Sequence, residues 1–231
     1  MREYLRRCPN SSIDDRWEWL FAALSLFAKY GLPAEVAARI IPICPPLWPA
    51  LTNETLPKKV RAVIGGTQKQ REQIQDWYGQ IRDWNVGGVT CMVRLFENAC
   101  DFNEDLSGWD VSQVTDMACM FNAAESFNQD LSSWHVSGVT DMVCMFRGAK
   151  SFNQDLGGWD VSQVTTMAHM FDGATSFNQD LSGWKVSATT DMAHMFNNAT
   201  SLDQEVRSWP LYNANTTCTH PPMNCAFWEQ D

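Results

Sequence analysis

Tryptophan recurs along most of this chain at an unbroken spacing of 25 residues, and no other feature of the sequence constrains the fold as much. A fixed period of this length is typical of a solenoid, in which each repeat is one coil that cannot bury its apolar face alone and has to stack on its neighbours. The sequence therefore predicts a repeat solenoid. The tryptophans that mark its period are Trp84, Trp109, Trp134, Trp159, Trp184 and Trp209.

Each repeat predicts a strand followed by a short helical turn, which makes the expected fold class α/β. Residues 106–111 have the spacing L-x-x-W-x-V, the form of a leucine-rich-repeat strand with tryptophan in the middle position. After the strand, Met117, Phe121 and their neighbours recur at three and four, which favours a helix or 3₁₀ turn with Thr115 as its N-cap. Stacked strands would give a six-strand parallel sheet, with strands beginning near Ile81, Leu106, Leu131, Leu156, Leu181 and Val206.

The recurring tryptophans and methionines are predicted to form ladders in the core. They return at the period of the repeat, so stacking between coils explains them without a cofactor. Besides the six tryptophans, the predicted core ladder contains Met117, Met142, Met167 and Met192. We expect no cofactor.

The sequence divides into three regions: a helical N-terminal cap (1–76), the solenoid (77–212) and a C-terminal tail or cap (213–231). Apolar spacing in the first region predicts helices over 13–30, 34–41, 56–64 and 68–77, with Gly65 and Gly66 separating the last two. Repeat proteins need such a cap to cover the end of their core. An alternative is that residues 32–36 with Ile40 and Ile41 resemble the opening of an F-box, which docks substrate receptors onto ubiquitin ligases.

The full repeat, F-N-Q-D-L-S-G-W-D-V-S-x-V-T-D-M-x-x-M-F, is similar to the 25-residue repeat of BspA-like leucine-rich-repeat surface proteins, also found in mycoplasma-type lipoproteins. This resemblance covers Trp77 to about Tyr212. It implies a right-handed solenoid used for adhesion or protein interaction, with no catalytic residue to carry over. The secreted members have an export signal or a lipid-attached cysteine, whereas Cys8 here follows two arginines.

The net charge of the chain and its lack of a recognisable targeting signal limit the classes of function that the sequence predicts. The chain has 17 basic and 27 acidic residues, a net charge of -10, which opposes binding to nucleic acid or to anionic membranes. The start of the chain lacks the apolar run of a secretory signal, and no later apolar run reaches the length of about 18 residues that a membrane span needs. We therefore expect an intracellular, cytoplasmic protein whose eight cysteines are thiols, with no membrane insertion.

Two kinds of chemical site are conceivable in this sequence, a metal site and a nucleophilic catalytic site. Cys119, Cys144, His169 and His194 share one position of the repeat, but a column spreads its members over several coils, whereas tetrahedral zinc gathers four ligands around one point. No metal site is predicted there. No cysteine or serine lies in a motif that would supply a base for nucleophilic catalysis, so the chain is not expected to be an enzyme.

The predicted function is a non-enzymatic protein-interaction or structural scaffold module that binds a protein partner through the solenoid surface or the helical cap. The alternatives are an F-box-like receptor of a ubiquitin ligase and a cell-surface adhesin. Solenoids usually bind through exposed positions of their coils. The candidate partner-binding residues are one such row: Asn85, Asp110, His135, Asp160 and Lys185, with Tyr212 at one end.

Overall fold

The computed structural model describes residues 50–187 and 190–203. The chain divides into two units, Met1–Pro49 and Ala50–Asp231, and every described residue belongs to the second. The predictions for 13–30, 34–41, the F-box-like segment, Val206, Trp209, Tyr212 and the tail lie outside the described residues.

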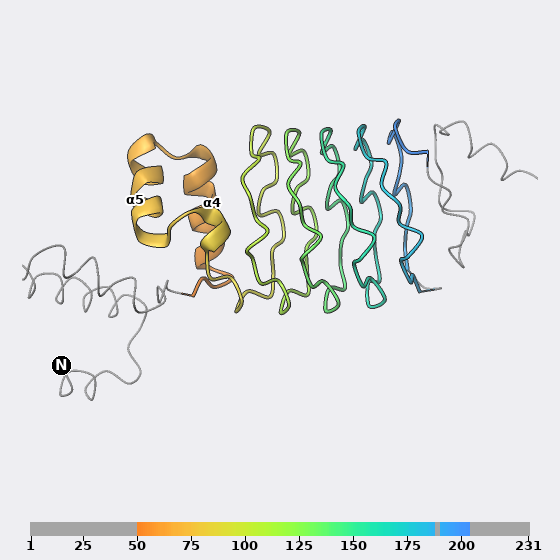
Figure 1. Cartoon of the computed structure of the whole chain (residues 1–231), viewed down its shortest axis with the longest axis horizontal. Helices are drawn as coiled ribbons and strands as arrows, with labels where there is room; N and C mark the ends of the chain where they lie inside the picture. Colours follow the sequence, from red (N-terminus) through yellow and green to blue (C-terminus); the bar gives the residue numbers. More distant parts are fainter. Residues whose placement is uncertain (1–49, 188–189, 204–231) are drawn as a thin grey trace, which may run out of the picture. The chain divides into compact units, whose positions relative to one another are not determined.

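Two α-helices and a 3₁₀ turn open the described part of the chain (Figure 1). Helix α4 (Thr55–Gly65) buries Leu56 and Val60 completely. It ends before Gly66, where a side chain would collide with the carbonyl of Ala62. Helix α5 (Gln68–Tyr78) begins at a capping box formed by Thr67 and Gln70, and η1 covers Ile81–Asp83. The two helices predicted on either side of the glycine pair are therefore confirmed.

After α5, the chain forms 25-residue coils that lie side by side (Figure 1). The coils comprise residues 79–103, 104–128, 129–153, 154–178 and, in the last, the described residues 179–187 and 190–203. The predicted parallel sheet of a leucine-rich-repeat solenoid is wrong, because no residue of the described ranges belongs to a strand. Neighbouring coils instead share isolated parallel bridges, which join Cys91, Asp116, Asp141, Thr166 and Asp191 in succession.

Turns within the predicted strand prevent it from extending. The N–H of Trp109 donates to the carbonyl of Leu106 at 3.1 Å, and the N–H of Val114 donates to that of Val111 at 2.9 Å. Both bonds close turns inside one coil, so the backbone there does not pair with the next coil as a strand would. The coils are joined at this point by side chains: the indole Nε1 of Trp134 donates to the carbonyl of Leu106 in the preceding coil at 3.1 Å.

The remaining indoles of the described coils make the same bond, with the exception of Trp84 in the first coil. Trp109, Trp159 and Trp184 donate to the carbonyls of Ile81, Leu131 and Leu156, at 2.6, 3.0 and 2.8 Å. The Nε1 of Trp84 is buried without a hydrogen-bond partner among the described residues, since no coil of the described chain precedes it. The indole N–H thus takes over part of the role of backbone pairing in a sheet.

The predicted helical turn after the strand is also absent from the described coils. Along 117–124, the backbone N–H groups donate in alternation to carbonyls of the same coil and to carbonyls of the next coil. Met120, Asn122 and Ala124 donate to the carbonyls three residues earlier, whereas Met117, Cys119, Phe121 and Ala123 donate to Asp141, Val143, Met145 and Arg147. Positive φ angles at Cys119 and Ala123, both 57°, reverse the backbone and exclude a helix.

Thr115 is not the N-cap that its position predicted. Its N–H and its Oγ1 both donate to the carbonyl of Thr90 in the preceding coil, at 2.9 and 3.2 Å. Thr140 and Thr165 repeat both bonds to the threonine before them. The threonines therefore form a ladder that joins coils, and no helix follows them in the described part.

The core consists of columns in which the same apolar side chain recurs in most of the described coils. The tryptophans from Trp84 to Trp184 are 2–3% exposed, Met117, Met142 and Met167 are fully buried, and Met192 is 6% exposed. A phenylalanine column stacks with ring centroids 5.3–5.6 Å apart; its members are Phe96, Phe121, Phe146, Phe171 and Phe196. A second column, spaced 6.0–6.1 Å apart, contains Phe102, Phe127, Phe152 and Phe177.

The segment before α4 joins the first coil through one asparagine. The Oδ1 of Asn53 accepts from the N–H of Thr90 and its Nδ2 donates to the Thr90 hydroxyl, both at 2.9 Å. In later coils the carbonyl of the preceding threonine accepts from that N–H. Asn53 thus supplies the acceptor that a preceding coil would otherwise provide.

Candidate interaction surface

The candidate partner-binding residues form one exposed column on the coils. Asn85, Asp110, His135, Asp160 and Lys185 occupy the same position of successive coils, and all of them are exposed. Tyr212 lies outside the described residues. The structure therefore brings five of the six candidates into one row, which presents one polar side chain per coil.

Charges in this column interact between neighbouring coils. Hydrogen bonds from Ser112 hold the pKa of Asp110 below its usual value, and the charge of His135 in the next coil adds to this effect. The pKa of Asp160 is lowered in the same way by Ser162, with a contribution from Lys185. The Oδ1 atoms of Asp110 and Asp160 each accept a serine backbone N–H at 3.1 Å. The row is therefore a set of fixed carboxylates alternating with cationic or neutral groups.

A second aspartate column lies four residues before Trp109, Trp134, Trp159 and Trp184. Asp105, Asp130 and Asp180 accept the N–H of the residue two positions on, each at 2.8 Å, and these hydrogen bonds lower the pKa of each carboxyl. A carboxylate accepts such a bond better than a carboxylic acid does, so each turn is more stable when its aspartate is ionised.

This second column makes acid stability testable. The folded-state pKa lies below the unfolded value of about 3.9, so the stabilisation is present above about pH 4 and is lost as pH falls through the folded-state pKa. Replacing Asp105, Asp130 and Asp180 by Asn keeps an oxygen acceptor but removes the titration. We expect this variant to lose less unfolding free energy between pH 5 and pH 2 than the parent does, as measured by urea denaturation. The corresponding Ala variants should be weakened throughout that range, and an unchanged pH slope in the Asn variant would contradict the assignment.

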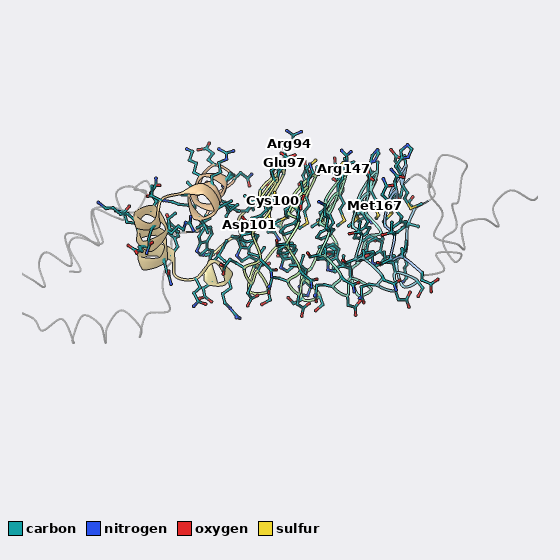
Figure 2. All side chains as sticks on the ribbon, turned by 90° about the horizontal axis from the view of Figure 1, so that it is seen from above. Arg94, Glu97, Cys100, Asp101, Arg147 and Met167 are labelled. Carbon is teal, nitrogen blue, oxygen red and sulfur yellow. The ribbon has the colours of Figure 1, made fainter. Side chains whose placement is uncertain are left out.

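A different edge of the coils carries ion pairs that sequence analysis missed. Figure 2 shows Arg94 and Arg147 along this edge. Arg94 lies 3.7 Å from Glu97, and Arg147 lies 3.2 Å from the Oδ2 of Asp172 in the next coil. Glu97 also accepts from Asn122 at 2.9 Å, and Lys150 pairs with Glu125 at the same distance. The pairs Arg147–Asp172 and Glu125–Lys150 join residues 25 apart, so only alignment of the copies at the period of the repeat would have shown them to be neighbours.

The column that contains the cysteines and histidines is a position of the repeat where the backbone has a positive φ angle. Arg94, Cys119, Cys144, His169 and His194 all have φ of 55–57°. The structure brings Cys119 beside Cys144, and it stacks the rings of His169 and His194 with centroids 4.9 Å apart. No group of three or more potential ligands that could hold a metal ion occurs among the residues described.

A second column of positive φ lies four residues further on. Its members are Asn98, Ala123, Gly148, Gly173 and Asn198. Glycine and asparagine tolerate this conformation, whereas an alanine there costs roughly 1–2 kcal/mol. Ala123 is therefore the least suited residue of this column.

Replacing Ala123→Gly should stabilise the protein. Relief of the left-handed backbone outweighs the greater entropy that glycine has when unfolded, so we expect a gain of about 0.5–1 kcal/mol in unfolding free energy. Chemical denaturation would measure it. Ala124→Gly is the matched control, because Ala124 is fully buried and its φ is not positive; that variant should lose stability. A loss at Ala123 as well would show that its backbone is not strained.

The family of the chain follows from its repeats. Residues 67–162 and 134–220 match the family described as "Mycoplasma protein of unknown function, DUF285". The chain belongs to this family. Its membership of DUF285 places it among mycoplasma-type repeat proteins, and the family's description assigns no activity. No curated protein and no solved structure matches the chain.

Neither helix of the described residues has the length and apolar character needed to cross a bilayer.

Proposed function

We propose that the chain is a non-enzymatic interaction module that binds a protein partner through the exposed column of Asn85, Asp110, His135, Asp160 and Lys185. The observation that carries this proposal is the contrast between the two sides of the coil. The core columns keep the same apolar residue, or a similar one such as Leu95 for Met120, from coil to coil, whereas this exposed column changes between amide, acidic and basic residues. Stacking of the coils requires the same kind of residue at each core position of the repeat. A surface position whose residue changes between coils is free of that requirement, so its residues can be selected for contact with a partner.

The geometry of the column suits recognition of a charged partner. Serine N–H groups hold the Asp110 and Asp160 carboxylates in place, so little side-chain entropy is lost when a cation binds them. His135 lies between two aspartates along the row, and Lys185 follows the second. Complementary charge of this kind contributes to specificity and to the rate of association.

The resemblance of the repeat to that of BspA-like surface proteins supports an interaction role. The resemblance implies adhesion or protein binding for those proteins. We extend to this chain only the interaction, and we assign the exposed column as the contact.

The experiment is affinity purification from the native cell with quantitative mass spectrometry, using the full chain and a variant carrying Asp110→Lys and Asp160→Lys. We expect the parent to enrich a protein that the variant loses by about 10-fold or more, because opposite charge at both carboxylates should cost about 1.4 kcal/mol of binding or more. Glu125→Lys with Lys150→Glu is the matched control, since it reverses an exposed ion pair elsewhere on the coil. Equal recovery by both variants would overturn the assignment of the column.

A further inference from the structure

Charge is unevenly distributed between the helices and the coils. Residues 50–78, which include α4 and α5, have five basic and three acidic residues. Residues 79–203, which include the coils, have 16 acidic and five basic residues. The net charge of -10 therefore arises in the coils, and the helices that precede them are a locally basic surface.

The outward side of α4 carries two cations without a carboxylate partner. Helix α4 buries Leu56 and Val60, whereas Lys58 and Arg61 are exposed. Residues three apart are neighbours on a helix, so Lys58 and Arg61 share one side of α4, which we call the basic face. In the part of the chain that the structure describes, no ion pair joins a basic residue of α4 or α5 to a carboxylate.

The aspartate column four residues before the tryptophans is a surface of opposite charge. It places one aspartate in each of four successive coils: Asp105, Asp130, Asp155 and Asp180. The Oδ1 of each accepts the N–H of the residue two positions on, at 2.8 Å, so each carboxylate is held in place. The last three are exposed. The column is therefore a row of positioned carboxylates that a cation can reach.

The first member of the column shows how it receives a cation. The Nη1 of Arg82 lies 2.7 Å from the Oδ2 of Asp105, the oxygen that does not accept the N–H of Ser107. In the following coils the position of Arg82 is taken by Ser107, Ser132 and Gly157. Those coils keep the carboxylate but lack the arginine, and the later three aspartates are in no ion pair among the residues described.

The carboxylates of the column also repel one another. Hydrogen bonds from Ser132 lower the pKa of Asp130, whereas the charge of Asp105 in the preceding coil acts in the opposite direction. A cation bound to the column offsets this repulsion. Because the carboxylates are already held in place, little side-chain entropy is lost when it binds.

We propose that the chain binds a second copy of itself, with the basic face of α4 in one copy against Asp130 and Asp155 of the aspartate column in the other. Each copy supplies the charge that the other copy's surface lacks. The two contacting surfaces differ, so the contact is heterologous, and each bound copy leaves one surface free for a further copy. This partner is distinct from the protein proposed to bind the column of Asp110 and Asp160.

The first test is the salt dependence of self-association, measured on the full chain by sedimentation equilibrium. The Debye length is about 10 Å at 0.1 M ionic strength and about 3 Å at 1 M. The lower concentration screens the long-range repulsion between two acidic chains but preserves the contact between opposite charges. The weight-average mass should therefore exceed the monomer mass of 26.2 kDa at 0.1 M and return to it at about 1 M.

The second test exchanges the charges of the two surfaces. One variant carries Lys58→Glu with Arg61→Glu, and the other carries Asp130→Lys with Asp155→Lys. Each variant alone brings like charges together, so its self-association should weaken by about 10-fold or more. An equimolar mixture should associate again, because each variant then meets a surface of opposite charge on the other.

Two further variants separate the contact from effects on folding. Asp130→Asn with Asp155→Asn keeps an oxygen that can accept the turn N–H, so it should preserve the circular dichroism spectrum while weakening association. Glu125→Lys with Lys150→Glu reverses an exposed ion pair elsewhere on the coils and should associate as the parent does. A parent that is monomeric at 0.1 M salt, association that persists at 1 M salt, or a mixture of the charge-exchanged variants that stays monomeric would overturn the proposal.

Discussion

Replacing Trp134 by Ala should cost about 3–5 kcal/mol of unfolding free energy. Trp134 is 3% exposed in an interior coil, so the truncation leaves a cavity between neighbours that are held by their own hydrogen bonds. The substitution also removes the indole donor from the carbonyl of Leu106. Urea denaturation with a two-state fit would measure the loss, and a change below about 1 kcal/mol would mean that the tryptophan contributes little to the stack.

Phenylalanine variants divide that cost between packing and hydrogen bonding. Trp134→Phe keeps much of the ring but removes one of the two donors to the Leu106 carbonyl, which still accepts from the N–H of Trp109, so it should cost about 0.5–1.5 kcal/mol beyond the packing loss. Trp84→Phe is the matched control, because the Trp84 Nε1 has no partner among the described residues. The control should lose less stability. Equal losses in the two variants would show that the indole bond contributes nothing measurable.

The period of the sequence predicted which residues stack, but not how the backbone joins the coils. Apolar positions such as Val111 and Met117 repeat at 25 residues, and burial of the apolar face explains their recurrence. The helices α4 and α5 were also predictable, because glycines and a capping residue mark their ends. Both kinds of prediction depend on side-chain polarity or on local backbone preferences, which a sequence shows directly.

The strand was wrong because its spacing does not distinguish a strand from a series of turns. In L-x-x-W-x-V, the same three apolar residues face the core when the backbone turns between Leu106 and Trp109. A strand and a series of turns differ in the carbonyls to which the backbone N–H groups donate. In this chain the backbone N–H groups close turns within a coil, and the indole N–H makes the bond between coils. Tryptophan in place of the expected leucine was the available signal, since its donor needs a partner when buried.

The positive-φ columns had a signal that was overlooked. Gly148 and Gly173 share their position with Asn98 and Asn198, and these two residue types are the ones that most readily adopt a left-handed backbone. Read down the column, they indicate a reversal at that position and argue against a helix. The exposed column could be placed from the period, whereas the coupling of Asp110 to His135 required knowledge of the distance between coils.

Removing one whole coil should leave a folded protein. Deletion of residues 127–151 joins Ser126 to Phe152, so every later residue keeps its position in the repeat. The ladders close again, because each coil offers the same donors and acceptors; Asn153, for example, can donate its N–H to the Oδ1 of Asn103 as Asn128 does. At about 0.05–0.15 kcal/mol per residue, the lost coil corresponds to about 1–4 kcal/mol of unfolding free energy.

A smaller deletion should do more damage. Removing only residues 127–138 takes out about half a coil, and the remainder is too short to pass around the core. The residues after the deletion then leave their columns, so the phenylalanine stack and the threonine ladder are both interrupted where Phe146 and Thr140 now lie. We expect this variant to unfold from the deletion onward, with loss of the near-ultraviolet circular dichroism of its buried tryptophans, while the 25-residue deletion keeps that signal and melts in one transition. The two deletions differ in whether the following residues keep their position in the repeat. If the 12-residue deletion were the more stable variant, the coils would not be interchangeable units.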